Sequence, residues 1–483
     1  MAGSFLFYDL ETFGTDPRSS RIAQFAAIRT DLDLQPIEAP ISFFVKPAHD
    51  LLPSPGATLV TGITPQMAER EGVNEAEAFS RIHEEMARPQ TCSLGYNSLK
   101  FDDEFVRHGL FRNFHDPYER EWRSGNSRWD LLDVFRLWHA LRPEGLAWPR
   151  REDGATLFKL EHLAEANGVR EGDAHEALSD VRALIALARL FRAAQPRLWD
   201  YALQLRNKRF AAGLLDVVAM APVLHVSQRF PASRMCAAPV VPLARHPRID
   251  NRIIVFDLDQ SPERLLELEA GDIADRLYTP AADLPEGEAR IALKEIHLNR
   301  CPALVAWQHL RPADFERLCI DRAEVERRAA LLREAGPALA DKLRRVFDDG
   351  REHAPSDVDG ALYDGFIADG DKRLFAEVRS TPPAALGERV FGFRDARLPE
   401  LLFRYRARNW PDTLSASESA RWDEYRRARW RDPDTGVARQ RAEIAALRAE
   451  HAGDADRLAL LDQLDAWRQH IGEGLMPAST EAP

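Results

Sequence analysis

Residues 5–14, which read FLFYDLETFG, constrain the fold more than any other stretch of this sequence. Aromatic and aliphatic side chains dominate the first half of the stretch, as in a buried β-strand. Because side chains on a strand repeat with period two, Asp9 and Glu11 project from the same face. Two carboxylates this close raise each other's affinity for protons unless a cation neutralises them. The stretch therefore predicts a divalent metal site, and its hard oxygen ligands suit Mg²⁺ or Mn²⁺.

Two later segments contribute further groups of the same chemistry. Asp102 ends the segment GYNSLKFD at residues 95–102, and the segment HEALSD at residues 175–180 contains His175 and Asp180. An acid-x-acid pair alone is common in an acidic chain and is usually a pair of solvated charges. The two additional carboxylates and the histidine favour a catalytic metal site over that interpretation.

The composition limits the class of protein. A length of 483 residues exceeds one ordinary core and predicts two or three domains. No apolar run is long enough to cross a bilayer and no signal segment is evident, so we expect a cytoplasmic location. The four cysteines have neither disulfide nor zinc spacing. A net charge of −12 argues against a nonspecific nucleic-acid coat but is compatible with a local basic groove.

The N-terminal part of the chain reads as an α/β domain. Residues 22–29, 40–46 and 91–96 are predicted strands, rich in apolar side chains. Asp102 follows the last of these strands at the start of a predicted helix, where active sites of open α/β sheets gather. A helix-capping role for Asp102 is the alternative, and Asp103 is interpreted as a solvated neighbour.

A long amphipathic helix is predicted after residue 175, with apolar positions that include Leu178, Val181 and Leu184. His175 lies at the entry to this helix, and Asp180 lies about one and a half turns further on. This offset separates the directions of the two side chains, so His175 need not be a ligand and is free to act as a base. A structural or solvated histidine is the alternative, and only the nearby carboxylates make the catalytic role preferable.

Arginines and aromatic residues alternate between these motifs. Arginines grip phosphates and aromatic rings stack on unpaired bases, as a channel for single-stranded nucleic acid requires. The alternative for each residue is a structural role, in which the aromatic side chains pack between helices and the arginines lie on the surface. The candidates for this channel are Arg107, Tyr118, Trp122 and Arg136, together with Lys208 from the basic cluster at residues 206–209.

The pattern changes after residue 197. Short strand-like runs then predict a small barrel-like β domain with inserted helices, and these runs are residues 222–226, 240–243, 253–258 and 291–298. Residues 324–347 read as helical, and helical spacing also dominates from about residue 355. In the last part, a set of arginines either lines a face that binds a nucleic-acid strand or belongs to a charge-laced surface helix. The set is Arg404, Arg406, Arg408, Arg426, Arg427, Arg429 and Arg431.

The pattern Asp9-x-Glu11, Asp102 and His175-x4-Asp180 resembles the DEDDh family of 3′→5′ exonucleases. More specific segments are similar to the bacterial exodeoxyribonuclease I family, and they read FYDLETFG, LKFDDE, NSRWDLLD and YRARN. The similarity extends over nearly the whole chain. It implies an α/β ribonuclease H-like exonuclease domain at residues 1–197, an SH3-like β-containing domain at 198–351, a helical C-terminal domain at 352–475 and a tail at 476–483.

The resemblance implies that the chain degrades single-stranded DNA to 5′-mononucleotides in DNA repair and recombination. Asp9, Glu11, Asp102 and Asp180 then form the acidic metal site, and His175 is the general base. Two Mg²⁺ ions, for which Mn²⁺ can substitute, are expected about 3.5–4 Å apart. Asp9, Glu11 and Asp180 are the expected direct ligands, while Asp102 acts from outside the ligand set.

The resemblance also implies contacts with DNA and with a partner protein. Glu11 and Lys159 join the expected DNA contacts; the family has arginine at the position of Lys159, and lysine keeps the charge but loses the two-pronged geometry. Arg142, Tyr201 and Arg311 are expected to bind the acidic C-terminal tail of single-stranded DNA-binding protein. Three domains in one chain can encircle a DNA strand, so we expect a monomer with no membrane partner.

Two other functions are compatible with the residues themselves. A 3′→5′ exoribonuclease would use the same five catalytic residues, although the long second and third domains favour DNA. A noncatalytic adaptor that binds DNA ends is expected to lack a carboxylate, and none is missing here.

Overall fold

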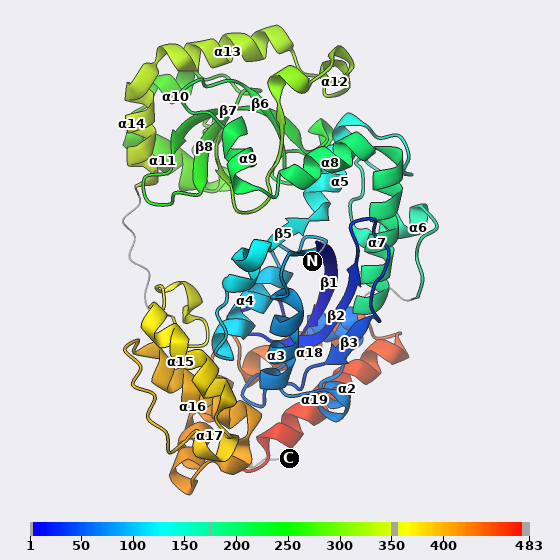
Figure 1. Cartoon of the computed structure of the whole chain (residues 1–483), viewed down its shortest axis with the longest axis vertical. Coiled ribbons are helices and arrows are strands. Elements are labelled where there is room, and N and C mark those ends of the chain that lie inside the picture. Colours follow the sequence, from blue (N-terminus) through cyan, green and yellow to red (C-terminus); the bar gives the residue numbers. More distant parts are fainter. Residues whose placement is uncertain (1–2, 173–175, 349–355, 476–483) are drawn as a thin grey trace. The chain divides into compact units, whose positions relative to one another are not determined.

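The computed structural model describes residues 3–172, 176–348 and 356–475, which form two compact units. The first unit combines Met1–Ser127, Glu171–Ala183 and Ala354–Pro483, and the second combines Arg128–Arg170 and Leu184–His353. The first unit therefore joins segments from both ends of the sequence, coloured blue to cyan and yellow to red in Figure 1. Among the described residues, no helix has both the length and the apolar character that crossing a membrane requires.

The sheet of the first unit is built on β1 (Ser4–Thr12), the strand expected from residues 5–14. β1 pairs in antiparallel with β2 (Ile22–Thr30) and in parallel with β4 (Thr91–Gly95). The order is β3-β2-β1-β4-β5, with β3 at Ile41–Phe44 and β5 at Ser127–Asp130. The predicted strands are confirmed with small shifts at their ends. Because β1 and β4 are parallel, their carboxyl ends meet at the same edge of the sheet.

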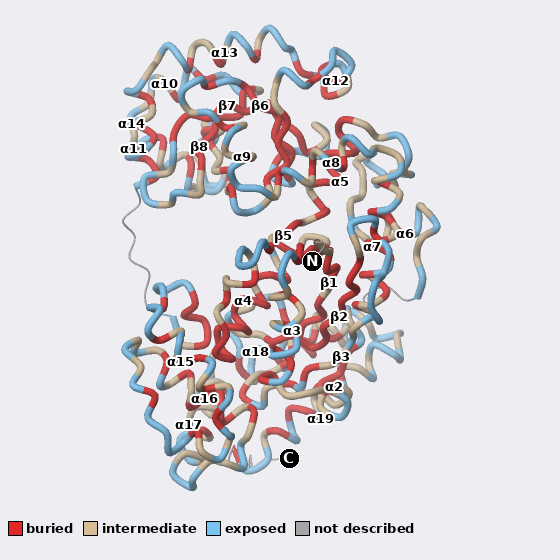
Figure 2. The backbone as a smooth tube through the Cα atoms, viewed as in Figure 1, coloured by how far each residue is buried: buried red, intermediate tan, exposed pale blue. Residues whose placement is uncertain are grey.

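The core of the first unit lies between this sheet and the helices α3 (Glu75–Met86) and α4 (Asp102–Arg112). Figure 2 shows β1 and β2 buried along most of their length. The buried side chains of this core include Leu6, Tyr8, Phe25, Phe79, Ile82, Phe105 and Leu110. The two helices approach closely because residue 109 is glycine: a Cβ atom there would lie 1.8 Å from Cζ of Phe79.

The C-terminal helices belong to the same unit. Their bounds are α15 (Asp369–Ser380), α16 (Arg397–Asn409), α17 (Ala416–Arg431), α18 (Val437–Glu450) and α19 (Ala455–Gly472). α16 packs on α3, while α18 and α19 contact α1 (Pro55–Thr61), which is followed by α2 (Pro65–Glu71). The C-terminal part therefore packs directly against the elements that flank the sheet.

The second unit contains an antiparallel sheet of order β10-β6-β7-β8-β9, which confirms the predicted β domain. Its strands are β6 (Val223–Val226), β7 (Ala237–Arg245), β8 (Arg252–Asp257), β9 (Leu293–His297) and β10 (Ala303–Ala306). β10 was not among the predicted strands.

Helices complete the second unit. They are α5 (Leu131–Leu141), α6 (Leu160–Ala166), α8 (Pro196–Gln204), α9 (Lys208–Leu214), α10 (Glu263–Glu267), α11 (Ala270–Tyr278), α12 (Pro312–Arg317), α13 (Arg322–Glu334) and α14 (Gly336–Phe347). α7 (Ala177–Ala194) begins in the first unit and ends in the second. The helical prediction for residues 324–347 is confirmed, but the chain forms two helices because it breaks before Gly336, whose φ is +62°.

Candidate active site

Three carboxylates converge at the carboxyl end of β1. Asp9 and Glu11 extend from β1, and Asp180 extends from the first turn of α7. One carboxylate oxygen from each residue lies within 4.8 Å of those of the other two. Mg²⁺ and Mn²⁺ prefer hard oxygen ligands of this kind, so the three residues fit a divalent metal.

Asp102 reaches the same cluster from the neighbouring strand. It is the first residue of α4, just beyond β4, and is 4% exposed. Phe101 occupies the N-cap of α4, so the helix-capping interpretation of Asp102 does not hold. Burial raises the pKa of Asp9, and the charges of Asp102 and Asp180 raise it further. Asp102 therefore acts electrostatically on the same site.

Asp103 was expected to be solvated, and that expectation was wrong. Its carboxylate is buried and accepts hydrogen bonds from the Tyr8 hydroxyl at 2.7 Å and the Arg120 guanidinium at 2.6 Å. These bonds fasten the start of α4 to β1. Asp103 thus has a structural task beside the acidic site.

The carboxylates are crowded enough to retain protons in the metal-free protein. Burial, followed by the charges of Asp9, Asp180 and Glu176, raises the pKa of Glu11 to about 9. A divalent cation can replace such protons and remove the repulsion between the carboxylates. The cluster therefore stores unfavourable electrostatic energy that metal binding releases.

We expect the metal-free protein to lose stability as the pH rises from about 5 to 9. Glutamate titrates near pH 4.3 in an unfolded chain, whereas Glu11 holds its proton to about pH 9 in the fold. The folded state binds more protons across this window, so the free energy of unfolding falls as the pH rises. Thermal denaturation in chelator measures the slope, which Glu11→Gln should reduce. A slope that is the same in wild type and Glu11→Gln would contradict the raised pKa.

His175 lies outside the described residues, and its role as the base stays a prediction. On the described side of this position, α7 begins at Ala177, which confirms the predicted helix. The Glu176 carboxylate accepts a hydrogen bond from the backbone N–H of Ser179 at 2.8 Å. This bond stabilises the first turn of the helix that carries Asp180.

The predicted DNA contacts of the first unit differ in how accessible they are. Trp122 is 67% exposed, and Tyr118 is half-buried with the Arg107 guanidinium 5.5 Å from its ring centroid. Arg107 is buried and forms ion pairs with Glu121 at 2.7 Å and Glu104 at 2.9 Å. Trp122 therefore offers an open ring for stacking, whereas two carboxylates already neutralise Arg107.

The predicted DNA contacts of the second unit also include both buried and exposed side chains. Arg136, on α5, is buried and pairs with Asp133 at 2.6 Å. The Lys159 side chain, at the start of α6, is 70% exposed and lies 3.3 Å from Glu161. Lys208, the first residue of α9, is also exposed. The two lysines are thus the accessible cations of this group.

The three predicted partner residues lie in the second unit. Arg142 and Arg311 both bind the buried carboxylate of Asp314, at 2.6 and 3.2 Å. The Tyr201 hydroxyl donates to the carbonyl oxygen of Leu304 at 2.9 Å. Asp314 was missed from the sequence, although an acid three residues after the residue preceding a helix is a recognisable signal. It fixes the two guanidinium groups near one another.

The arginines of α16 form neither of the predicted surfaces. Arg404 and Arg406 are buried, the Arg408 side chain is 4% exposed, and all three are paired with acidic residues. Both interpretations of these arginines were wrong because helical spacing does not reveal that their acidic partners are also inside the protein.

The mixed sheet and its convergent carboxylates define the class of ribonuclease H-like exonuclease domains, followed here by a β domain and a helical region. Family models described as exonuclease, exonuclease I SH3-like domain and exonuclease I C-terminal domain match residues 6–188, 206–349 and 356–471. Exodeoxyribonuclease I of Escherichia coli (strain K12) is 45% identical over 471 residues, which cover 97% of this chain and 98% of that protein. The chain belongs to the exodeoxyribonuclease I family.

Solved structures agree with this assignment. A moderately thermophilic exonuclease I from Methylocaldum szegediense has 48% identity and a TM-score of 0.93, covering 97% of this chain and all (100%) of that one. E. coli exonuclease I in complex with a dA16 oligonucleotide has 45% identity and a TM-score of 0.94, with the same coverage of 97% and 100%. A complex of the E. coli enzyme with single-stranded DNA is also known in a zinc ion bound form. The resemblance and the fold class expected from the sequence are confirmed.

Proposed function

We propose that this chain is a metal-dependent 3′→5′ exonuclease that degrades single-stranded DNA to 5′-mononucleotides. The convergence of Asp9, Glu11 and Asp180 within 4.8 Å is the observation that carries the proposal. The oligonucleotide complexes of E. coli exonuclease I support the choice of substrate. A role in DNA repair and recombination and a cytoplasmic location are part of the same proposal.

Asp9, Glu11 and Asp180 are the proposed ligands of two Mg²⁺ ions, for which Mn²⁺ can substitute. When bound, the ions stabilise the charge that develops on the scissile phosphate and acidify the attacking water. Asp102 adds negative charge from outside the ligand set, and His175 accepts the proton of the water. The water oxygen bonds to phosphorus, the bond from phosphorus to the 3′ oxygen breaks, and that oxygen takes a proton from solvent. A 5′-mononucleotide is released.

The proposed DNA contacts fall into two groups, exposed side chains and side chains that are more buried. Trp122 stacks on unpaired bases, and Lys159 and Lys208 bind backbone phosphates, because all three side chains are exposed. Glu11 contacts the terminal nucleotide. Arg107, Tyr118 and Arg136 complete the proposed DNA-binding set, in which the arginines act while held by their acidic partners.

The proposed domains are residues 1–197, 198–351 and 352–475, followed by a tail at 476–483 that lies outside the described residues. The three family-model matches support this division, since each falls inside one proposed domain. One chain then supplies every element that surrounds the DNA, so the proposed active form is a monomer.

A digestion time course on 3′-blocked and 5′-blocked single strands, with and without chelator, tests the proposal. We expect a 3′ block to stop digestion, a 5′ block to have no effect, and chelator to abolish the reaction. Equal digestion of RNA and DNA of the same sequence would favour the exoribonuclease. DNA-end binding without any metal-dependent digestion would favour the noncatalytic adaptor.

We also propose that Arg142, Tyr201 and Arg311 bind the acidic C-terminal tail of single-stranded DNA-binding protein. The two guanidinium groups that share Asp314 support this choice, because one buried acid leaves the pair with a net positive charge. The Tyr201 ring supplies an apolar surface for the tail.

Arg142→Ala is expected to weaken binding of a peptide with this acidic tail by roughly tenfold or more, since it removes a charge-assisted hydrogen bond. Fluorescence anisotropy of a labelled peptide measures the change. Arg322→Ala is the control, because Arg322 is an exposed arginine of α13 paired with Glu326. If both variants bind the peptide as wild type does, the pocket is misplaced.

A further inference from the structure

A buried ionic cluster joins the C-terminal helices to the loop that follows β1, entirely within the first unit. The side chains of all its members except Asp357 are buried. The cluster contains Arg21, Arg112, Arg404, Arg408, Asp50, Glu75, Asp357 and Asp359. Arg404 also pairs with Glu400 at 2.9 Å. Charges at this depth are costly unless each one meets a partner. The parts of the chain that contribute them are therefore held in fixed relation.

Arg408 on α16 is the centre of this cluster. Its guanidinium donates to both carboxylate oxygens of Asp50, at 3.0 and 2.8 Å, and to both of Asp359, at 2.7 and 2.6 Å. Burial raises the pKa of Asp50, but the charge of Arg408 outweighs it and brings the pKa to about 2. The contacts are therefore charge-assisted hydrogen bonds, which are among the strongest in proteins.

Asp359, one acidic partner of Arg408, connects this arginine to the loop at the end of β1. Asp359 lies 3.8 Å from the Arg21 guanidinium, which also pairs with Glu75 at 3.4 Å. The carbonyl oxygen of Arg21 accepts a hydrogen bond from the backbone N–H of Phe13 at 2.9 Å. This bond closes the loop that begins where β1 ends.

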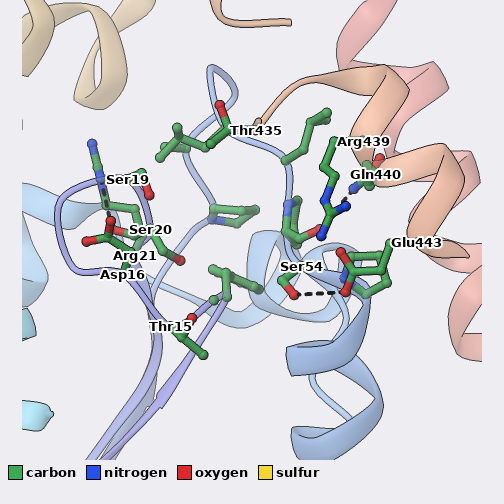
Figure 3. Close-up of a pocket in the computed structure, with 18 of the residues that line it drawn as sticks. Thr15, Asp16, Ser19, Ser20, Arg21, Ser54, Thr435, Arg439, Gln440 and Glu443 are labelled. Carbon is green, nitrogen blue, oxygen red and sulfur yellow. Dashed lines mark hydrogen bonds between the residues drawn. The ribbon is translucent and has the colours of Figure 1, made fainter. Parts of the chain in front are cut away.

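Asp50, the other acidic partner of Arg408, is connected to Phe13 as well. Asp50 lies four positions before Ser54, whose backbone N–H donates to the carbonyl oxygen of Phe13 at 2.7 Å. Figure 3 shows Ser54 next to Glu443 of α18, and Glu443 also accepts from the backbone N–H of Gly56 at 3.1 Å. The backbone N–H and carbonyl groups of Phe13 are thus both hydrogen-bonded to segments that the C-terminal helices hold in place.

Packing gives this loop little support on one side. A pocket of about 240 Å³, drawn in Figure 3, lies between residues 13–21, residues 47–55 and α18. The register of β1 against β2 also shifts between Glu11 and Thr12. On the other side, Phe13 packs with Ala23, Ile63 and Ala68, so this packing and the polar anchors together hold the loop beyond the shifted ladder.

We propose that Arg408 is a positioning residue for the metal site: it holds the loop after β1 and, through that loop, the carboxylate of Glu11. The inference rests on the proposed function, since it concerns the metal that Asp9, Glu11 and Asp180 bind. It gives the C-terminal helices a task at the catalytic centre that is separate from any contact with DNA.

Direct Mn²⁺ binding to the metal-free full-length protein, measured by titration calorimetry, tests the inference. We expect Arg408→Met to raise the dissociation constant of Mn²⁺ about tenfold and to raise the Mg²⁺ concentration for half-maximal digestion in parallel. Affinity for single-stranded DNA in chelator should change less than about twofold, because the variant leaves the DNA contacts in place.

Arg406→Met is the matched control. Arg406 is a buried arginine of the same helix, but it pairs with Glu418 at 2.6 Å and so within the C-terminal helices. We expect this variant to lower Tm without changing the affinity for Mn²⁺. A merely structural role for Arg408 would make the two variants equivalent.

Asp359→Asn provides a second variant should Arg408→Met fail to fold, because it keeps the shape of the side chain and lowers only the charge. We expect it to weaken Mn²⁺ binding about threefold. A folded Arg408→Met or Asp359→Asn protein with the wild-type affinity for Mn²⁺ would overturn the inference, as would equal weakening in Arg406→Met. Absence of Mn²⁺ binding in the wild type would instead refute the proposed metal site.

Discussion

Asp180→Asn is expected to lower the rate of Mg²⁺-dependent digestion by on the order of 10³-fold or more, because it removes one of three charges that hold the metal. We expect the opposite effect on stability. The charge of Asp180 raises the pKa of both Asp9 and Glu11, so its removal relieves repulsion in the metal-free protein. A gain of about 1 kcal/mol corresponds to a Tm increase of roughly 1–2 °C in a protein of this size. Mononucleotide release and thermal denaturation in chelator measure the two effects.

Asp103→Asn is the control for this prediction. Asp103 is also a buried acid near β1, but it is matched by Arg120 at 2.6 Å. Removing its charge leaves the Arg120 guanidinium without its buried counter-ion, so Tm should fall while the stabilisation by Mg²⁺ is retained. Full activity in Asp180→Asn would rule out the assigned ligand set. A lower metal-free Tm in Asp180→Asn would show that the three carboxylates do not repel one another as described.

His175→Ala is expected to lower kcat by about 10²- to 10⁴-fold, the contribution typical of a general base. Affinity for Mn²⁺ should be retained, since the carboxylates are unchanged. Only a neutral imidazole accepts a proton, so the wild-type rate should rise with pH across the range in which histidine titrates. The variant should lose this dependence. Single-turnover digestion across a pH series measures both properties.

His470→Ala controls for the loss of a histidine, because His470 is an exposed residue of α19. It should digest DNA at the wild-type rate. An unchanged rate in His175→Ala would require another base. Loss of Mn²⁺ binding in the same variant would make His175 a ligand instead.

The strand pattern and one half of the metal site follow from the local sequence. Asp9 and Glu11 lie two residues apart on a strand, so their common face is a consequence of backbone geometry. The start of α2 is equally local, since the Thr64 side chain accepts from the backbone N–H of Met67 with Pro65 at the first helical position. Such features were predictable because the atoms involved are close in sequence.

The other half of the site required the fold. The arrival of Asp180 within 4.8 Å of Asp9 and Glu11 depends on how α7 packs against the sheet. The sequence offered Asp180 as a further carboxylate, but its role as a direct ligand came from the resemblance to a family, and periodicity alone does not supply it. The break near Gly336 was likewise missed, because a short interruption changes the helical period little.

The sequence by itself determined where the charged residues stand and which of them share a face of a strand or helix. Only the tertiary structure decided which charges are buried together, as Asp103 with Arg120 and Arg408 with Asp50 and Asp359 illustrate. The physical reason is that the cost of burying a charge depends on its partner. That partner is 17 positions away for Asp103 and 358 positions away for Asp50, and no local pattern records such a pairing.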